Sequence, residues 1–117
     1  MKYVCLVYLV EKDMNAMTKG ESDACSDESL AYDDALRNAG YLVVAHALQP
    51  VEAATTVRVR NGKLSATDGP FAETKEQLGG FILIEARDLN DAIQVAAKIP
   101  LARRGSIEVR PIREFRP

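Results

Sequence analysis

The chain has 117 residues, of which 47% are hydrophobic and 27% are charged, and its net charge at neutral pH is −2. This balance is typical of a soluble globular protein and excludes an intrinsically disordered chain. Without an excess of positive charge, the composition also argues against binding to nucleic acid or to an anionic membrane surface. The length predicts a single domain over residues 1–117 that is large enough to bury its own core.

The first ten residues, MKYVCLVYLV, predict a strand that is buried on two faces, because both alternating sets of side chains are apolar. The run is too short to span a bilayer, and no cleavage site of small residues follows it. Cys5 falls in this strand and Cys25 in the next element, which suits reduced thiols better than a disulfide. We therefore expect a cytoplasmic protein.

A helix is predicted to begin after Thr18, because Glu21 follows at the spacing of a capping box. Apolar residues then recur at helical spacing, at Cys25, Tyr32, Leu36 and Ala39. Gly40 supplies the left-handed residue that commonly ends a helix. Residues 41–48 and 55–60 are the next two predicted strands.

Asn61-Gly62 predicts a tight hairpin, after which FILIEA at 81–86 forms another apolar strand. Asp88 is expected to cap a second helix, which Pro100 ends. Its buried stripe is predicted at Leu89, Ala92, Ile93, Ala96 and Ile99. Residues 106–112 add the last strand. The order predicts an α+β protein with a ferredoxin-like βαββαβ plan and an extra hairpin strand, in which both helices cover one face of a mainly antiparallel sheet.

The other face of this predicted sheet requires a cover. The first strand and FILIEA are apolar on both sides, whereas two helices can cover only one side. At roughly 25 cal/mol per Å² of apolar area, an uncovered sheet face would forfeit on the order of 10 kcal/mol. We therefore expect a homodimer, sheet against sheet, with a cavity or seam between the two copies.

Three long motifs occur in order: ATTVRVRNGK at 54–63, DGPFAETKEQLGGF at 68–81 and GSIEVRPI at 105–112. Together they closely resemble the YCII-related, DGPF-type family of small bacterial proteins, and the resemblance extends to ALQP at 47–50 and DLNDAI at 88–93. It implies a dimeric α/β barrel with a polar pocket near the dimer seam. Family members are often encoded beside extracytoplasmic-function sigma factors, which implies a functional link to such a factor. Some relatives were proposed to be enzymes that use a His and Asp pair.

Asp68 and His46 are the candidate catalytic residues. Asp68-Gly69-Pro70 is favourable turn chemistry in itself, and a carboxylate held by such a turn could also act as a general base or bind a substrate hydroxyl or amine. His46 is the one histidine of the chain, and histidine is the residue type best suited to proton exchange near neutral pH. Its alternation with Val44 and Leu48 on one strand face fits a packed histidine equally well.

Four further residues are candidates for substrate binding: Glu73, Lys75, Arg58 and Tyr8. Glu73 and Lys75 belong to the signature loop, and binding residues concentrate on loops above rigid scaffolds. Arg58 could clamp an anion, and the Tyr8 hydroxyl could enter a cavity. Each has a structural alternative. Glu73 and Lys75 could fix the loop by salt bridges to the arginines of the hairpin, Arg58 could lie on a solvated strand edge, and Tyr8 could be a packed core residue. Gly79-Gly80 indicates a hinge or, more commonly beside a strand, a close backbone approach.

Two classes of function stay open. The first is an enzyme that acts on a small molecule at the dimer seam, with Asp68 and His46 as acid and base. The second is a non-catalytic ligand-binding or regulatory module that reports to a partner such as a sigma factor. The sequence contains no activated nucleophile, metal-ligand cluster or cofactor motif, so we expect no metal and no cofactor.

Overall fold

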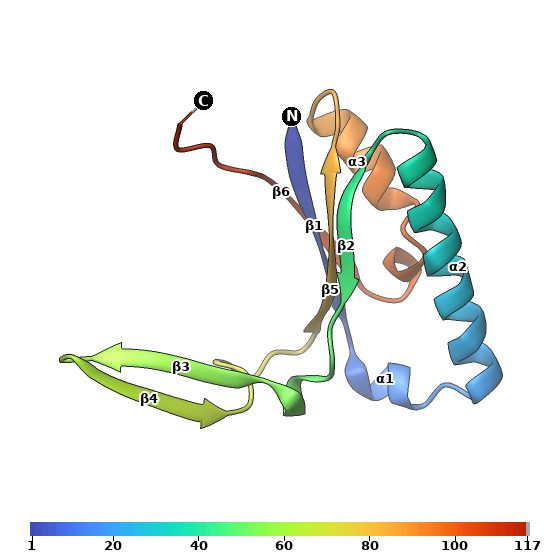
Figure 1. The fold of residues 1–117 in the computed structure, drawn as a ribbon. Coiled ribbons are helices and arrows are strands. Elements are labelled where there is room, and N and C mark those ends of the chain that lie inside the picture. Colours follow the sequence, from blue (N-terminus) through green and yellow to red (C-terminus); the bar gives the residue numbers. More distant parts are fainter. Residues whose placement is uncertain (117) are drawn as a thin grey trace.

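The structure is a computed structural model that describes residues 1–116. Its centre is a four-stranded antiparallel sheet with the strand order β2-β5-β1-β6 (Figure 1). The strands are Lys2–Leu9 (β1), Leu42–Ala47 (β2), Gln77–Glu85 (β5) and Ser106–Pro111 (β6). This α+β arrangement is compatible with the expected ferredoxin-like plan.

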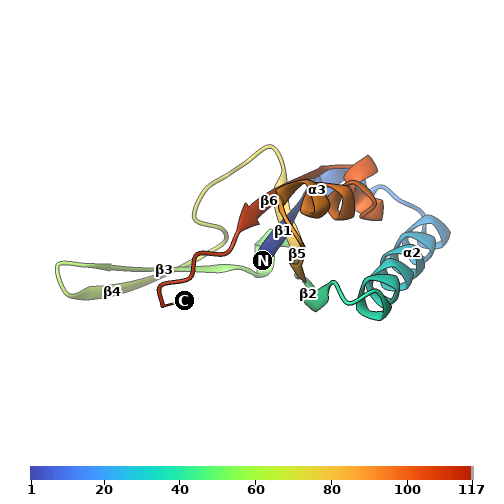
Figure 2. The same ribbon diagram turned by 90° about the horizontal axis from the view of Figure 1, so that it is seen from above.

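The helices are Glu11–Asn15 (α1), Lys19–Asn38 (α2) and Leu89–Ala97 (α3), and two 3-10 turns cover Val51–Ala53 (η1) and Pro100–Arg103 (η2). α2 and α3 lie on the same side of the sheet (Figure 1 and Figure 2). The sequence did not predict α1 or either 3-10 turn. None of the helices described in residues 1–116 combines the length and the apolar character needed to cross a membrane.

Both predicted ends of α2 are confirmed. The Thr18 side chain accepts a hydrogen bond from the Glu21 N–H, and the Glu21 carboxylate accepts one from the Thr18 N–H, each at 3.1 Å. At the other end Gly40 has a φ of +84°, and the Tyr41 N–H donates to the Leu36 carbonyl at 2.9 Å. These contacts satisfy backbone groups that a helix end otherwise leaves without partners.

The core lies between the helix-side face of the sheet, α3 and the last turns of α2. In β1 the buried residues alternate with half-buried ones, and Cys5 is fully buried. Of the twenty residues of α2, Leu36 alone is buried. The predicted stripe of α3 is wrong in part, since Leu89 and Ile93 are 50% and 45% exposed. Val95 is buried together with Ala92, Ala96 and Ile99, so the helix is rotated from the predicted orientation.

The start of α3 contains the one charged side chain that is buried in the described chain, Asp91. The Asp88 carboxylate caps the helix by accepting from the Asp91 N–H at 2.8 Å, as predicted. The Asp91 carboxylate accepts hydrogen bonds from Arg87 and from the Tyr41 hydroxyl. These bonds, above all those from Arg87, lower the pKa of Asp91 to about 2.

Strands Thr55–Arg60 (β3) and Lys63–Asp68 (β4) form a separate hairpin, which projects from the sheet on the side opposite α2 and α3 (Figure 1). Its turn is the predicted Asn61-Gly62, and both residues have positive φ, 53° and 73°. The pairing divides the hairpin into an apolar face and a basic face. The apolar face carries Val57, Val59, Leu64 and Ala66, and the basic face carries Arg58, Arg60 and Lys63.

The Gly79-Gly80 pair makes the close backbone approach that the sequence predicted. A Cβ on Gly80 would lie 2.8 Å from the His46 carbonyl oxygen, and one on Gly79 would lie 2.9 Å from Leu9 Cδ1. Between Val7 and Tyr8 the pairing with β5 skips one residue, which is the pattern of a β-bulge. β5 begins at Gln77, four residues before the predicted start, because the bulge keeps the glycine segment within the sheet.

The sheet face opposite α2 and α3 is termed the open face. It carries apolar side chains from the two central strands, all half-buried in the single chain: Val4, Leu6, Tyr8, Phe81 and Leu83. The prediction that β1 carries apolar side chains on both of its faces is thus confirmed. In the single chain nothing from the helices covers this second side.

Candidate functional site

A cavity of about 820 Å³ lies beside residues 69–76, the loop between β4 and β5, and is termed the loop cavity. Its walls come from this loop, from residues 48–56 and from the end of β1. The lining combines apolar and polar side chains, among them Tyr8, Leu48, Thr55, Phe71, Glu73 and Gln77. The volume is in the range of about 300–1,000 Å³ that is usual for small-molecule sites.

Two polar side chains hold the walls of the loop cavity together. The Gln77 side-chain oxygen accepts a hydrogen bond from the Glu11 N–H at 3.0 Å, and its amide nitrogen donates to the Thr74 carbonyl at 2.6 Å. The Glu11 carboxylate accepts from the Val51 N–H at 2.9 Å. Glu11 and Gln77 therefore connect α1, η1 and the loop, and the sequence analysis missed both of them.

The two ends of the loop are also fastened. At its start the Gly69 N–H donates to the Ala54 carbonyl at 2.7 Å, and the Thr56 hydroxyl donates to the Gly69 carbonyl at 2.8 Å. Gly69 has a φ of +97°, a conformation that favours glycine at this turn. At its end the Ser106 hydroxyl donates to the Glu76 carboxylate at 3.0 Å. The cavity therefore has fixed walls, which favours a preformed site.

The structure places two of the candidate residues, Tyr8 and Glu73, in the lining of the loop cavity. Tyr8 stands on the open face, where its neighbours across the strands are Leu78 and Ser106. Its half-buried ring therefore joins the open face to the cavity. Glu73 is exposed and comes from the loop itself.

Asp68 is the last residue of β4 and directly precedes the loop, but it is not among the residues that line the loop cavity. Its partner across the hairpin is Thr55, which lines the cavity, and directly opposed residues of antiparallel strands point to the same face. The Asp68 side chain is exposed, and no hydrogen bond or ion pair within residues 1–116 involves its carboxylate. The carboxylate is therefore available to an external donor.

Arg58 and Lys75 lie outside the lining of the loop cavity. Arg58 is exposed on the basic face of the hairpin, two residues beyond Thr56. Lys75 is exposed on the loop, between Thr74 and Glu76. Neither side chain makes a salt bridge within the described residues. The loop is therefore not held by salt bridges to the arginines of the hairpin; hydrogen bonds of Glu76 and Gln77 hold it instead.

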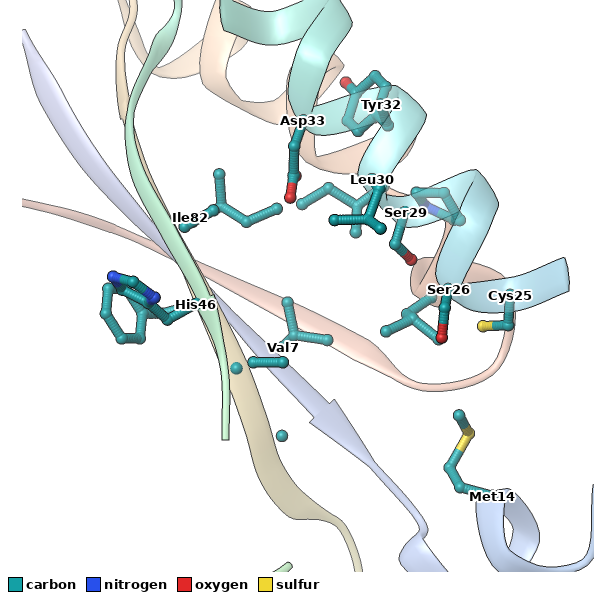
Figure 3. Close-up of a pocket in the computed structure, with 18 of the residues that line it drawn as sticks. Val7, Met14, Cys25, Ser26, Ser29, Leu30, Tyr32, Asp33, His46 and Ile82 are labelled. Atoms are coloured by element: carbon teal, nitrogen blue, oxygen red, sulfur yellow. The ribbon is translucent and has the colours of Figure 1, made fainter. Parts of the chain in front are cut away.

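His46 lies on the open face of β2. Its imidazole packs edge to face against Phe81, with the ring centroids 5.8 Å apart, and points away from α2 (Figure 3). Leu48, two residues further along, lines the loop cavity. Among the described residues of one chain, Asp68 and His46 do not line a common cavity.

A second cavity, of about 480 Å³, lies between α2 and the opposite side of the sheet and is termed the helix cavity (Figure 3). The main chain of β2 and the Gly79-Gly80 pair form part of its floor. Within residues 1–116, no group of three or more His, Cys, Asp or Glu side chains is placed to hold a metal ion.

Two comparisons with known proteins match regions of the chain that include the whole site. The family model described as YCII-related domain matches residues 1–116. An uncharacterised protein of Rhizobium meliloti (strain 1021) is 38% identical over 119 aligned residues, which cover 100% of this chain and 96% of the relative. Both matches include every wall of the loop cavity.

Proposed function

The chain belongs to the YCII-related domain family, and from this premise we propose that it binds a small molecule in the loop cavity, at the seam of a homodimer. One observation carries the proposal: the cavity has hydrogen-bonded walls, and Tyr8 of the apolar open face is part of its lining. Signature residues Phe71 and Glu73 line it, so the most distinctive motif of the sequence contributes directly to the site.

A second copy of the chain is the proposed cover for the open face. Leaving Leu6, Phe81 and Leu83 in contact with water would sacrifice their contribution to stability, and a symmetric sheet-to-sheet contact would bury them. The hairpin needs the same partner, because an isolated two-stranded hairpin is marginally stable in water. Its Val59 and Leu64 are 59% and 72% exposed in the single chain. The assembly that covers both surfaces is the dimeric α/β barrel.

The lining indicates the class of ligand. Leu48, Phe71 and Leu78 offer apolar contact area, and the Glu73 carboxylate in the lining can accept hydrogen bonds. Asp68 is outside the lining, but it pairs with the lining residue Thr55 and brings a second carboxylate near the cavity. We propose a small molecule that carries hydroxyl or amine donors on an apolar framework. Asp68 would bind such a donor from the end of β4, and the Tyr8 hydroxyl would bind from β1.

Acid–base chemistry by Asp68 and His46 is the catalytic form of this proposal, and it requires that the two residues meet across the dimer. Within one chain Asp68 and His46 do not line a common cavity, and this favours a second candidate function. In it the same site binds a ligand without reaction and serves regulation, with a sigma factor as the proposed partner.

A thermal-shift screen of metabolites tests the binding site. A ligand that binds only the folded protein raises Tm by mass action. We expect a hit to raise the Tm of the wild-type protein, and to raise it less in Asp68→Ala and Glu73→Ala. Asp27→Ala, an exposed carboxylate on α2, is the matched control. Equal shifts in all four proteins would place the ligand elsewhere and refute the proposed site.

Light scattering on a size-exclusion column tests the dimer separately. We expect the wild-type protein to have twice the mass of a single chain, and Leu6→Lys on the open face to reduce it to the mass of one chain. Leu30→Lys is the control, because Leu30 is 63% exposed on α2. A wild-type monomer would contradict the dimer seam but leave the loop cavity of each chain open to the metabolite screen.

A further inference from the structure

The helix cavity exists because α2 contacts the core at one end only. Leu36 is buried, and the Tyr32 hydroxyl donates to the Val95 carbonyl at 2.7 Å, which fixes the second half of the helix to α3. The first half has no buried residue, although it is held in helical form by its capping box. The space between this half and the sheet is the helix cavity.

The two walls of the helix cavity differ in chemistry. The sheet side is apolar and built from small or branched residues, among them Val7, Ala45, Gly80 and Ile82. The α2 side is mixed: besides Leu30 it carries polar groups, and the side chains of Ser26, Ser29 and Asp33 lie on the side of the helix that faces the cavity (Figure 3). An occupant must therefore present an apolar surface to the sheet and a polar group to the helix.

Asp33 supplies a negative charge without a partner. Its carboxylate points from α2 toward Ile82 (Figure 3), and none of the hydrogen bonds or ion pairs in residues 1–116 includes it. The nearest cation in the helix, Arg37, forms an ion pair with Asp34 instead. Half-burial in these apolar surroundings is the main cause that raises the pKa of Asp33. A half-buried carboxylate gains most from an opposite charge that enters the same space.

The other residues that line the helix cavity indicate that its ligand carries a positive charge. No Lys or Arg side chain lines the helix cavity in the described chain, and His46 contributes its main chain while its ring lies on the other side of the sheet. An anion would find no cationic side chain in this lining and would be repelled by Asp33. A neutral apolar molecule would leave the Asp33 carboxylate without a partner.

We propose that the helix cavity binds a small organic cation, an amine carried on an apolar body, with the Asp33 carboxylate as its counter-ion. The ammonium group donates to Asp33 and to the hydroxyls of Ser26 or Ser29, and the apolar body lies on Val7 and Ile82. This site is on the opposite side of the sheet from the loop cavity, so it does not depend on the proposed dimer.

Cys25 gives a direct readout, because it lines the same cavity and is half-buried. The probes are 3-phenylpropylamine, the neutral 3-phenylpropan-1-ol and the anionic 3-phenylpropanoate, and the measurement is the rate of Cys25 alkylation by iodoacetamide, followed by mass spectrometry. We expect the amine to protect Cys25 at a concentration about tenfold lower than the alcohol requires, which corresponds to about 1.4 kcal/mol. The propanoate should not protect.

Two variants assign this preference to Asp33. In Asp33→Asn the amine and the alcohol should protect at similar concentrations, whereas Asp27→Asn, an exposed carboxylate on the same helix, should keep the preference of the wild-type protein. Equal protection by all three probes in the wild-type protein, or no protection by any of them, would overturn the proposal without use of a variant. A preference for the amine that persists in Asp33→Asn would also overturn it.

Discussion

Gly105 lies directly against the main chain of Tyr8. A Cβ placed on Gly105 would collide with the Tyr8 carbonyl oxygen and would lie 3.1 Å from Leu9 Cδ2. Gly105 precedes β6, whose first residue, Ser106, pairs with Tyr8 and holds the loop through Glu76. The absence of a side chain at residue 105 therefore sets how closely β6 approaches the wall of the loop cavity.

Gly105→Ala should destabilise the protein. The new methyl group meets a backbone oxygen rather than a flexible side chain, so β6 must shift, at a cost of about 1–3 kcal/mol. Chemical denaturation measures the loss. Gly20→Ala is the matched control, because nothing lies within 4 Å of a Cβ at that helical residue, and we expect it to add about 0.5–1 kcal/mol. If both variants gained stability, the close approach of β6 would be refuted.

Asp91 should make stability depend on pH in the acidic range. Its pKa is about 2 in the folded chain against an ordinary 3.8, since Arg87 and Tyr41 bind the charged form. The stabilisation is complete above about pH 4 and is lost as the pH falls toward about 2. In Asp91→Asn we expect Tm to be lower at neutral pH by roughly 5 °C, and its decline with acid to be shallower. Parallel Tm curves for the two proteins would contradict this role.

Thr18→Ala should weaken the start of α2. The substitution removes the side-chain oxygen that caps the Glu21 N–H, and N-cap losses of this kind cost about 1 kcal/mol. Urea denaturation monitored by circular dichroism measures the change. Thr67→Ala, at an exposed strand residue without a side-chain hydrogen bond in the described chain, is expected to cost less. Equal losses in both variants would show that the capping box contributes nothing specific.

The two thiols should differ strongly in reactivity. Burial raises the pKa of Cys5 to about 11 from an ordinary 9.0, which lowers its thiolate fraction about a hundredfold at mildly alkaline pH. Cys25 is half-buried and borders the helix cavity. We expect one rapid alkylation in the native protein, and none in Cys25→Ser. Rapid modification of Cys5 in that variant would contradict this expectation, because it would mean that the sheet often opens far enough to expose the buried Cys5 thiol.

Most of the fold was predicted from local sequence patterns, each formed by residues only a few positions apart. The Thr18–Glu21 box, the Asp88 cap and the Asn61-Gly62 turn are such signals, and all three are confirmed. The rotation of α3 was not predictable in this way, because it depends on packing against the sheet. A helical pattern alone cannot decide whether Ile93 or Val95 faces the core.

The site was predictable only in part, for a related reason. The signature motif located the loop, and with it the lining residue Glu73 and the neighbouring Asp68. Glu11 and Gln77 were missed because the hydrogen bond between them joins residues 66 positions apart, and neither belongs to a local pattern. The helix cavity was missed as well. The apolar spacing of α2 runs from Cys25 to Ala39 and does not show that Leu36 is the one buried residue of the helix.

The pairing of β1 has a consequence for synthesis. Residues 2–9 leave the ribosome before the other strands of the sheet, yet both strands that flank them, β5 and β6, begin only at residues 77 and 106. The central strand β1 therefore stays unpaired until β5 has been synthesised, and its apolar side chains are exposed to other nascent chains during this time. Truncation before residue 106 would remove one whole neighbour of β1, so a shortened chain should aggregate rather than fold.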